Sequence, residues 1–131
     1  MVLVGHVIAI MVGGALGALS RYGVSQLTVL WLGKGFPYGT LIVNGVGSLL
    51  IGFLSVYFLT KTNGDPMVKL AVLVGFLGAF TTFSTFAMDT LVLLEAGAMA
   101  KGLLNIALNV CLSLLGVWIG MIVARSIFTP Y

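Results

Sequence analysis

The chain has 131 residues, of which 60% are hydrophobic and only 7% are charged. A soluble globular domain is about 45–50% apolar and about 25% charged. This composition, with a mean hydropathy of +1.22, therefore excludes an ordinary soluble enzyme, a disordered chain and a nucleic-acid binder. The net charge of +3 comes from a few scattered side chains, which make no phosphate-binding patch. The composition predicts an all-α membrane protein.

Four long stretches of the chain carry no Asp, Glu, Lys or Arg: residues 2–20, 35–60, 70–88 and 102–124. A transmembrane helix needs about 20 mostly apolar residues, so we expect a single domain over residues 1–131 with four spans. These spans cover roughly residues 4–32, 39–60, 67–95 and 101–125. Between the second and third spans, the Asn-Gly and Asp-Pro pairs within Lys61–Pro66 predict a turn.

The flanking cations are balanced between the two sides of the membrane. With four spans, both termini lie on one side, and three cations fall on each side: Lys61, Lys69 and Arg125 against Arg21, Lys34 and Lys101. The positive-inside rule then gives no preferred orientation. Either another feature sets the orientation, or the chain inserts both ways round, which favours an antiparallel homodimer with dual topology.

Small and polar residues give the first two spans distinct faces. Gly13 and Gly17 have the spacing that lets two helix backbones approach closely. Arg21 follows near the end of the first span, where it can anchor in the headgroups. In the second span, Asn44 and Ser48 share one helical face. Because an unpaired amide in hydrocarbon is costly, Asn44 either bonds to a neighbouring helix or faces a pore.

The third span places four hydroxyl side chains in the middle of an apolar segment: Thr81, Thr82, Ser84 and Thr85. We expect the helix to break there, at a place where freed backbone groups are buried in protein or line a cavity. Phe80, Phe83 and Phe86 are spaced three apart through this region. Such a stripe is usually packing, but the electropositive edge of a phenyl ring can also face an anion.

The fourth span carries Asn105, Asn109 and Ser113 at i, i+4 and i+8. Three polar residues in register predict the wall of a water or ion path. The sequence has no metal-ligand cluster, phosphate-binding loop or catalytic set of side chains. The residues alone therefore predict a small polar path for an anion, with no enzyme and no organic cofactor.

Three motifs, in order along the chain, carry a resemblance to a known family. They are Gly-Gly-Ala-Leu-Gly-Ala-Leu-Ser-Arg-Tyr at 13–22, Gly-Thr-Leu-Ile-Val-Asn-Gly-Val-Gly-Ser at 39–48 and Gly-Phe-Leu-Gly-Ala-Phe-Thr-Thr-Phe-Ser-Thr-Phe at 75–86. With them the chain resembles the Fluc (CrcB) fluoride channels of bacteria. The resemblance implies an antiparallel homodimer in the lipid of the inner membrane, with two pores that export fluoride passively from the cytoplasm.

The resemblance also implies roles for individual residues. Asn44 matches the pore asparagine of the family, and Phe83 and Phe86 match two phenylalanines whose ring edges meet the ion. Further matches to the pore are Thr40, Ser84, Thr85 and Ser113, and Arg21 matches an arginine that attracts anions at a vestibule. The additional pore candidates Asn105 and Asn109 rest on helical spacing.

The helix break would present the backbone carbonyls of Gly78 and Thr81 to a structural sodium ion on the two-fold axis, as the resemblance implies. The chain departs from the family at Asp89, where relatives carry Glu, and at Ala87, where they carry Ser. The role of the Asp89 carboxylate stays open at this stage.

Two other functions compete with a channel. A small dual-topology exporter coupled to protons needs an ionisable group deep in a span, and Asp89 is the in-span candidate. A non-transporting assembly subunit would explain the glycine spacings but leaves the hydroxyl-rich break without a purpose.

Overall fold

The computed structural model describes residues 2–61 and 65–129, and every regular element in them is helical. Four segments are long and apolar enough to cross a membrane: α1 (Val2–Leu32), α2 (Tyr38–Thr60), Pro66–Glu95 and α6 (Met99–Phe128). The predicted all-α architecture with four membrane-length helices is thereby confirmed. The Asn-Gly part of the predicted turn, residues 63–64, lies outside the described residues.

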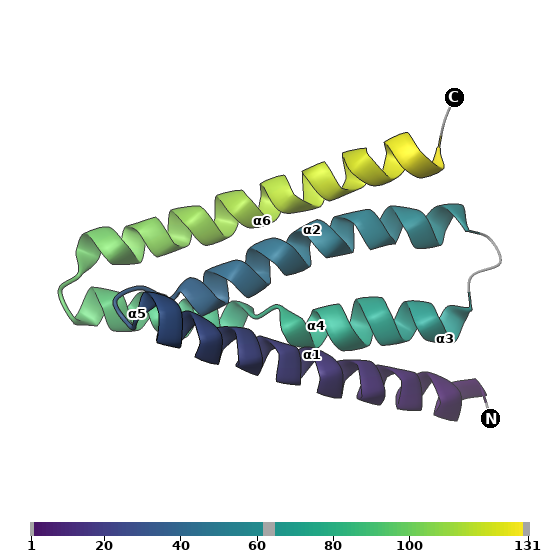
Figure 1. The fold of residues 1–131 in the computed structure, drawn as a ribbon, viewed down its shortest axis with the longest axis horizontal. Helices are drawn as coiled ribbons and strands as arrows, with labels where there is room; N and C mark the ends of the chain where they lie inside the picture. The colour runs from purple at the N-terminus through teal and green to yellow at the C-terminus, as the bar shows by residue number, and fades with distance from the viewer. Residues whose placement is uncertain (1, 62–64, 130–131) are drawn as a thin grey trace.

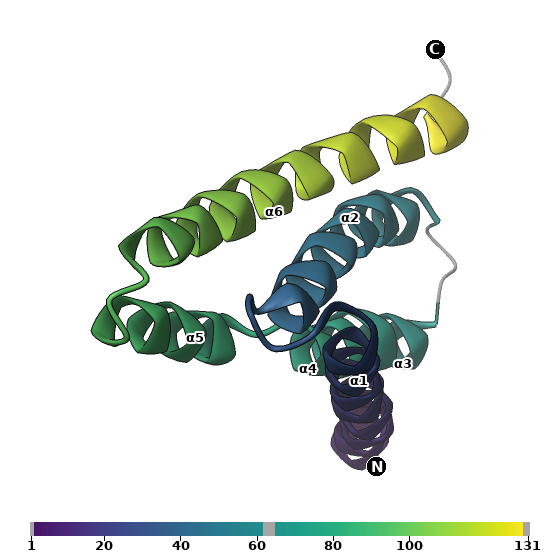
Figure 2. The same ribbon diagram turned by 60° about the vertical axis from the view of Figure 1, so that its left-hand side comes forward.

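The third segment is divided into four elements: α3 (Pro66–Lys69), the π-helix η1 (Leu70–Leu77), α4 (Gly78–Phe80) and α5 (Phe83–Glu95). Figure 1 shows the start of α1, the end of α2, the start of α3 and the end of α6 at one end of the bundle. The connections from α1 to α2 and from α5 to α6 lie at the other end. In the rotated view of Figure 2, α6 lies above α2, and α1 lies below α3 and α4.

Local chemistry explains where several of the helices begin and end. Asp65 caps α3 by accepting a hydrogen bond from the Met67 N–H (2.8 Å), and Pro66 occupies the first helical position. Gly33 and Gly97 follow α1 and α5 with φ of 76° and 75°. Because side chains disfavour this left-handed conformation, glycine ends both helices at low cost.

Helix α1 lies against η1 through backbone-to-backbone contact. A Cβ atom built on Gly13 would collide with the Ala71 carbonyl, and one on Gly17 would collide with the Phe76 carbonyl. On the facing side, Gly75 leaves no room for a Cβ because the Ile10 carbonyl lies 2.7 Å from its position. The close packing predicted from the glycine spacing is therefore confirmed, and its partner is the π-helical stretch.

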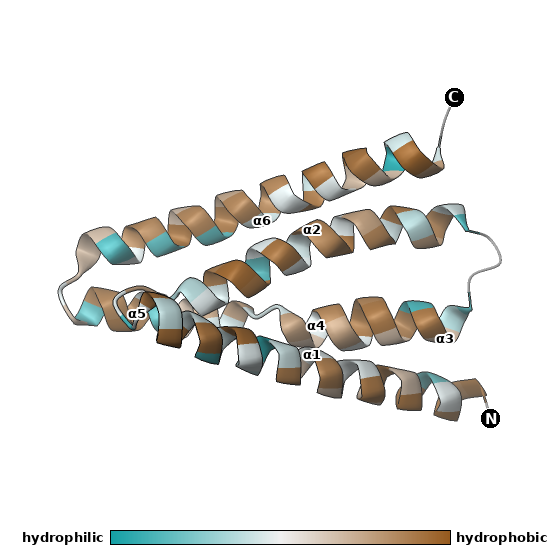
Figure 3. Cartoon of the chain, viewed as in Figure 1, coloured by the Kyte–Doolittle hydropathy of each residue, from teal (hydrophilic) through white to brown (hydrophobic). Residues whose placement is uncertain are grey.

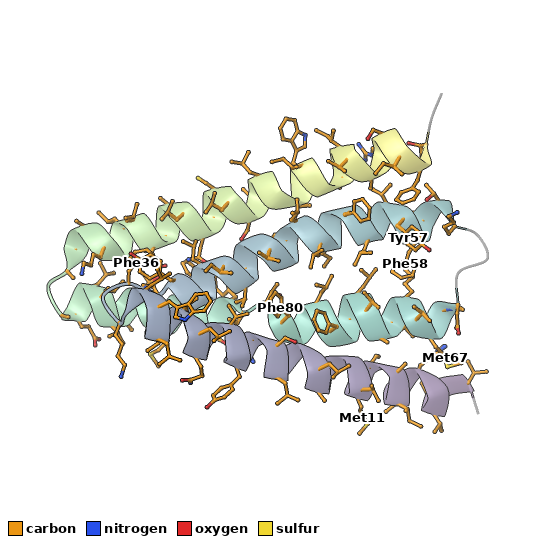
Figure 4. All side chains as sticks on the ribbon, viewed as in Figure 1. Met11, Phe36, Tyr57, Phe58, Met67 and Phe80 are labelled. Carbon is orange, nitrogen blue, oxygen red and sulfur yellow. The ribbon has the colours of Figure 1, made fainter. Side chains whose placement is uncertain are left out.

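Helices α2 and α6 meet in the same manner over their second halves. A Cβ on Gly52 would collide with the Val117 carbonyl, and one on Gly120 would collide with the Leu49 carbonyl. Near the ends of both helices, the ring of Phe128 packs against Tyr57 with centroids 5.2 Å apart. Figure 4 labels Tyr57 and Phe58 near this end of the bundle.

Hydrophobic side chains cover most of the outer surface, and few residues are fully buried. Val43 and Leu77 are 0% and 1% exposed, whereas many Leu, Ile and Val side chains are exposed. Figure 3 shows apolar ribbon along all the long helices, with hydrophilic bands on the first half of α6 and on α2. Asn44 of α2 and Asn105 and Asn109 of α6 belong to the candidate site.

Candidate functional site

The break in the third segment lies at Thr81 and Thr82. Thr81 has a ψ of 158° and Thr82 has φ and ψ of −154° and 119°, so both are extended. Thr82 then caps α5, because its Oγ1 accepts a hydrogen bond from the Thr85 N–H (3.2 Å). The hydroxyl cluster seen in the sequence thus ends one helix and begins the next.

Asn44 of α2 closes the gap that the break leaves in the backbone. The Thr82 N–H donates to Asn44 Oδ1 (2.8 Å), and Asn44 Nδ2 donates to the Thr82 carbonyl (3.0 Å). A Cβ on Gly47, one turn further along α2, would collide with the methyl group of Thr81. The close approach of α2 brings the Asn44 amide to the break, where it satisfies the backbone N–H and carbonyl of Thr82. Hydrocarbon offers these groups no partner.

A row of hydrogen-bonded side chains runs from Asn44 on α2 through α6 to α5. Asn44 Nδ2 donates to Asn109 Oδ1 (3.0 Å), and Asn109 Nδ2 donates to Asn105 Oδ1 (2.9 Å). Asn105 Nδ2 then donates to Thr90 Oγ1 (2.9 Å), whose hydroxyl donates to the Phe86 carbonyl (2.8 Å). This row, which we call the amide row, links three helices at membrane depth.

A cavity of about 420 Å³, called here the central cavity, opens beside the amide row. Its polar and aromatic lining consists of Asn44, Ser48, Thr81, Thr82, Phe83, Phe86, Asn109 and Ser113. The rings of Phe83 and Phe86 lie edge to face with centroids 5.3 Å apart. Phe83 is 77% exposed and Phe86 is 8% exposed, so the pair reaches from the buried interior to the open side of the chain.

Two further cavities lie on the other side of Thr82. One, of about 250 Å³, is lined by Arg21, Thr40, Thr82 and Thr85 among others. The second, of about 340 Å³, shares Thr40 and Thr85 with it and reaches Lys34 and Asp89. The Thr40 hydroxyl donates to Asp89 Oδ2 (2.6 Å). Thr82 lines both the central cavity and the cavity of Arg21, so the break stands between them.

The predicted site residues fall into three groups in the structure. The central cavity brings together Asn44, Phe83, Phe86, Asn109 and Ser113. The cavities beyond Thr82 bring together Arg21, Thr40 and Thr85. Of the remaining four, Thr81 also lines the central cavity, whereas Asn105, Ser84 and Gly78 line none of these three cavities.

Asn105 was expected to line a path, but it lies apart from the three cavities. Its side chain is 0% exposed and bonds to Thr90 and Asn109. The helical spacing of the stripe on α6 is correct, but the start of α6 lies against α5, which covers Asn105. The stripe therefore begins as interhelical hydrogen bonding and opens to a cavity only from Asn109 onward.

Three residues with a clear place in the site were absent from the sequence-based set of candidates. Thr82 pairs with Asn44 and caps α5, Thr90 ends the amide row, and Ser48 lines the central cavity. A signal for Thr82 was present, because threonine is among the residues preferred at a helix N-cap. Thr90 had no such signal, since its partner lies on another helix.

The comparisons with known proteins point in one direction. The family described as CrcB-like protein, Camphor Resistance (CrcB), matches residues 8–121. The chain is 50% identical over 91% of its length to the "Fluoride-specific ion channel FluC" of Methylococcus capsulatus, of which it covers 52%. It thus spans about half of that relative. Proteins of the same description from Hydrogenovibrio crunogenus and Vibrio vulnificus are 41% and 49% identical and are covered to 95% and 93% of their lengths.

Proposed function

This chain belongs to the CrcB family, and from this membership we propose that it is a fluoride-selective ion channel, not an enzyme. Its four membrane-length helices make it a multi-pass membrane protein. The proposed channel lets fluoride leave the cytoplasm passively across the bacterial inner membrane. The observation that carries the proposal is the pairing of the broken third segment with Asn44 between cavities lined by hydroxyl groups and ring edges.

The chemistry of the central cavity suits a small, strongly hydrated anion. Hydroxyl groups of Ser48 and Ser113 can donate hydrogen bonds, and the rings of Phe83 and Phe86 can offer electropositive edges. Conduction requires binding that is favourable enough to admit the ion and weak enough to release it. Neutral donors meet this requirement better than a fixed cation, and the residues that line this cavity are all uncharged.

The cavities beyond Thr82 supply the proposed entrance. Arg21 lines one of them and would raise the local concentration of anions through its positive charge. In the other cavity, the carboxylate of Asp89 offsets the charge of Lys34. From there, the hydroxyls of Thr40 and Thr85 lead toward Thr82. The ion would pass the break at Thr82 and reach the rings of the central cavity.

Two observations support an antiparallel homodimer with dual topology. The flanking cations are equal in number at the two ends of the bundle, so either orientation satisfies the positive-inside rule. On the third segment, Ser84, Thr85 and the ring of Phe83 are exposed in the single chain. A second, inverted copy would cover these hydroxyls, complete each pore and give the dimer two pores.

The backbone at the break suits a structural sodium ion. In a continuous helix the N–H groups of Thr82 and Thr85 would bond to the carbonyls of Gly78 and Thr81. Here both N–H groups bond to side-chain oxygens of Asn44 and Thr82 instead. The carbonyls of Gly78 and Thr81 are thus relieved of their usual donors and can hold a hard cation. The bound ion would supply a fixed positive charge that ties two copies of the chain together.

Fluoride efflux from liposomes that contain the purified chain tests the proposal. A channel should release fluoride down its gradient at a rate that is independent of an imposed proton gradient. A proton-coupled exporter, for which Asp89 in its bond to Thr40 is the candidate carrier group, would instead change its rate with that gradient. A non-transporting assembly subunit would release none, and either of these results would contradict the channel.

A further inference from the structure

The orientation of the Asn44 amide is set by the backbone of Thr82. A backbone N–H can only donate a hydrogen bond, and a carbonyl oxygen can only accept one. The Thr82 N–H therefore requires Oδ1 of Asn44, at 2.8 Å, and the Thr82 carbonyl requires Nδ2, at 3.0 Å. One of the two possible placements of the amide satisfies both groups, and the other satisfies neither.

The same rule orients the rest of the amide row. Asn44 directs Nδ2 at Asn109, which must present Oδ1 to it (3.0 Å). Asn109 Nδ2 donates to the backbone carbonyl of Asn105 (3.1 Å), which can only accept and so fixes Asn109 independently. Asn109 is 4% exposed and Asn105 is 0% exposed. Burial and backbone groups at both ends thus hold the amides in one direction.

The Asn44 amide has no unengaged N–H group to offer to the central cavity. An amide nitrogen carries two N–H groups, and Asn44 uses one on the Thr82 carbonyl and the other on Asn109 Oδ1. Asn44 lines the central cavity, yet both of its donors are engaged. An anion that reaches the cavity obtains a donor from Asn44 only by displacing one of these two acceptors.

We propose that Asn109 is a positioning residue whose Oδ1 holds the second N–H of Asn44 and yields it to fluoride, so that the Asn109 carbonyl competes with the ion for one donor. This inference rests on the proposed function. The bonds of Asn44 to Thr82 stay in place during the exchange, so the amide need not turn. Asn109 lines the same cavity as Asn44, which leaves the ion and the carbonyl within reach of the same N–H.

The competition would adjust how long the ion stays. Asn44 is half-buried and lines the cavity, so an N–H that Asn109 left unpaired would gain a whole net hydrogen bond when it binds fluoride. With Asn109 in place, the ion gains only the difference in free energy between its own hydrogen bond to this N–H and that of the Asn109 carbonyl. Asn109 thereby weakens fluoride binding and speeds release, which conduction requires.

The test compares the wild-type chain with Asn109→Leu, whose side chain has the same branching of heavy atoms and no acceptor. Fluoride flux from liposomes is measured over a range of fluoride concentrations. We expect the half-saturating concentration to fall about tenfold, the equivalent of one net hydrogen bond, and the maximal flux to fall as well. Calorimetric titration of the purified variant with fluoride should show the same tighter binding without any transport.

Two further variants make the result specific. Asn109→Ser has a shorter, polar side chain that withdraws the acceptor from Asn44, and it keeps the test valid if the Leu variant fails to fold. Its half-saturating concentration should also fall. Ser113→Ala is the matched control on α6, since it removes a hydroxyl that lines the same cavity. Its half-saturating concentration should rise, because a direct donor to the ion is lost.

The other outcomes overturn the inference in distinguishable ways. If both Asn109 variants raise the half-saturating concentration, Asn109 is itself a donor to the ion. If they leave it unchanged and lower only the yield of folded protein, Asn109 is structural. A wild-type chain that neither conducts nor binds fluoride overturns the proposed function and this inference with it, whereas conduction with an unchanged half-saturating concentration overturns the inference alone.

Discussion

The two halves of the third membrane segment are held in place by different means. Before the break, η1 lies against α1 where Gly17 and Gly75 allow backbones to touch, and Leu77 is 1% exposed. After the break, α5 is held by the hydrogen bond from Asn105 to Thr90, and Phe83 is 77% exposed. Among the described residues, no side-chain hydrogen bond joins the first half to another helix, whereas the second half depends on a few such bonds.

This difference separates anchoring from ion handling. A backbone contact through glycine tolerates no added atom and has no alternative partner, so it holds the helix rigidly. A hydrogen bond between side chains can be exchanged for one to another acceptor of similar strength. The half of the segment that is held by such bonds, and that leaves its aromatic face open, is therefore where an ion can interact with the protein.

The largest effect is expected from adding one methyl group to the packed half. Gly17→Ala places a Cβ against the Phe76 carbonyl, and relieving this overlap should destabilise the fold by about 3 kcal/mol. Size-exclusion chromatography and thermal unfolding in detergent should show loss of the monodisperse species. Gly23→Ala is the matched control on α1, because nothing lies within 4 Å of its Cβ position, and it should behave as wild type. Equal stability of the two variants would contradict the anchoring role.

The next largest effect is on transport and comes from the bond that joins α2 to the break. Asn44→Asp replaces a donor by an acceptor that faces the Thr82 carbonyl and Asn109 Oδ1. A carboxylate in this place repels both oxygens and any anion, so fluoride efflux should fall to background. Normal efflux by a well-folded variant would remove Asn44 from the pathway.

The aromatic side chains on the two sides of the break should respond differently to the same change. Phe83→Leu and Phe86→Leu conserve most of the volume and should cost about 1 kcal/mol or less in packing, but they remove ring edges from the central cavity. Fluoride flux should fall at least severalfold while the protein stays monodisperse. The control is Phe76→Leu, since Phe76 stacks on Phe80 at 5.7 Å before the break and should conduct normally. Wild-type flux in both cavity variants would assign the rings to packing.

The smallest effect is expected from a change in the balance of flanking cations. This balance lets the chain insert in both orientations, so that an inverted copy can cover the exposed face of α5. C-terminal tags on the unmodified chain should be found on both sides of the membrane. Two lysines added to the C-terminus should bias insertion toward one orientation. Flux should fall partially, because fewer chains then meet an inverted copy. A one-sided tag on the unmodified chain would contradict the homodimer.

Much of the fold followed from local chemistry. Charge-free apolar stretches predicted the four membrane-length helices, and the hydroxyl cluster at residues 81–85 predicted the break, because both depend on neighbours in the chain. The glycine spacing of Gly13 and Gly17 predicted close packing, but the sequence contained no signal for the π-helical form of the facing stretch. The π-helical stretch packs its backbone against α1, and a contact between two separate helices leaves no mark in the local sequence.

The site was only partly readable because its partners are far apart in the chain. Spacing left Asn44 undecided between interhelical bonding and a pore, and the structure assigns it both places, bonded to Thr82 and lining the central cavity. Spacing also grouped Asn105 with Asn109, although Asn105 bonds to Thr90 of α5 and Asn109 lines the central cavity. A helical repeat tells which side chains share a face, and it carries no information about what lies opposite that face.

The sequence by itself determined that this chain resides in a membrane, where its helices lie and where the third segment breaks, because hydrophobicity, backbone satisfaction and capping act over a few residues. Only the tertiary structure decided which acceptor each amide meets. Asn44 lies 38 residues from Thr82 and 65 from Asn109, and the direction of its amide is set by a backbone N–H on another segment. An orientation imposed by such a distant group exists only once the helices have packed.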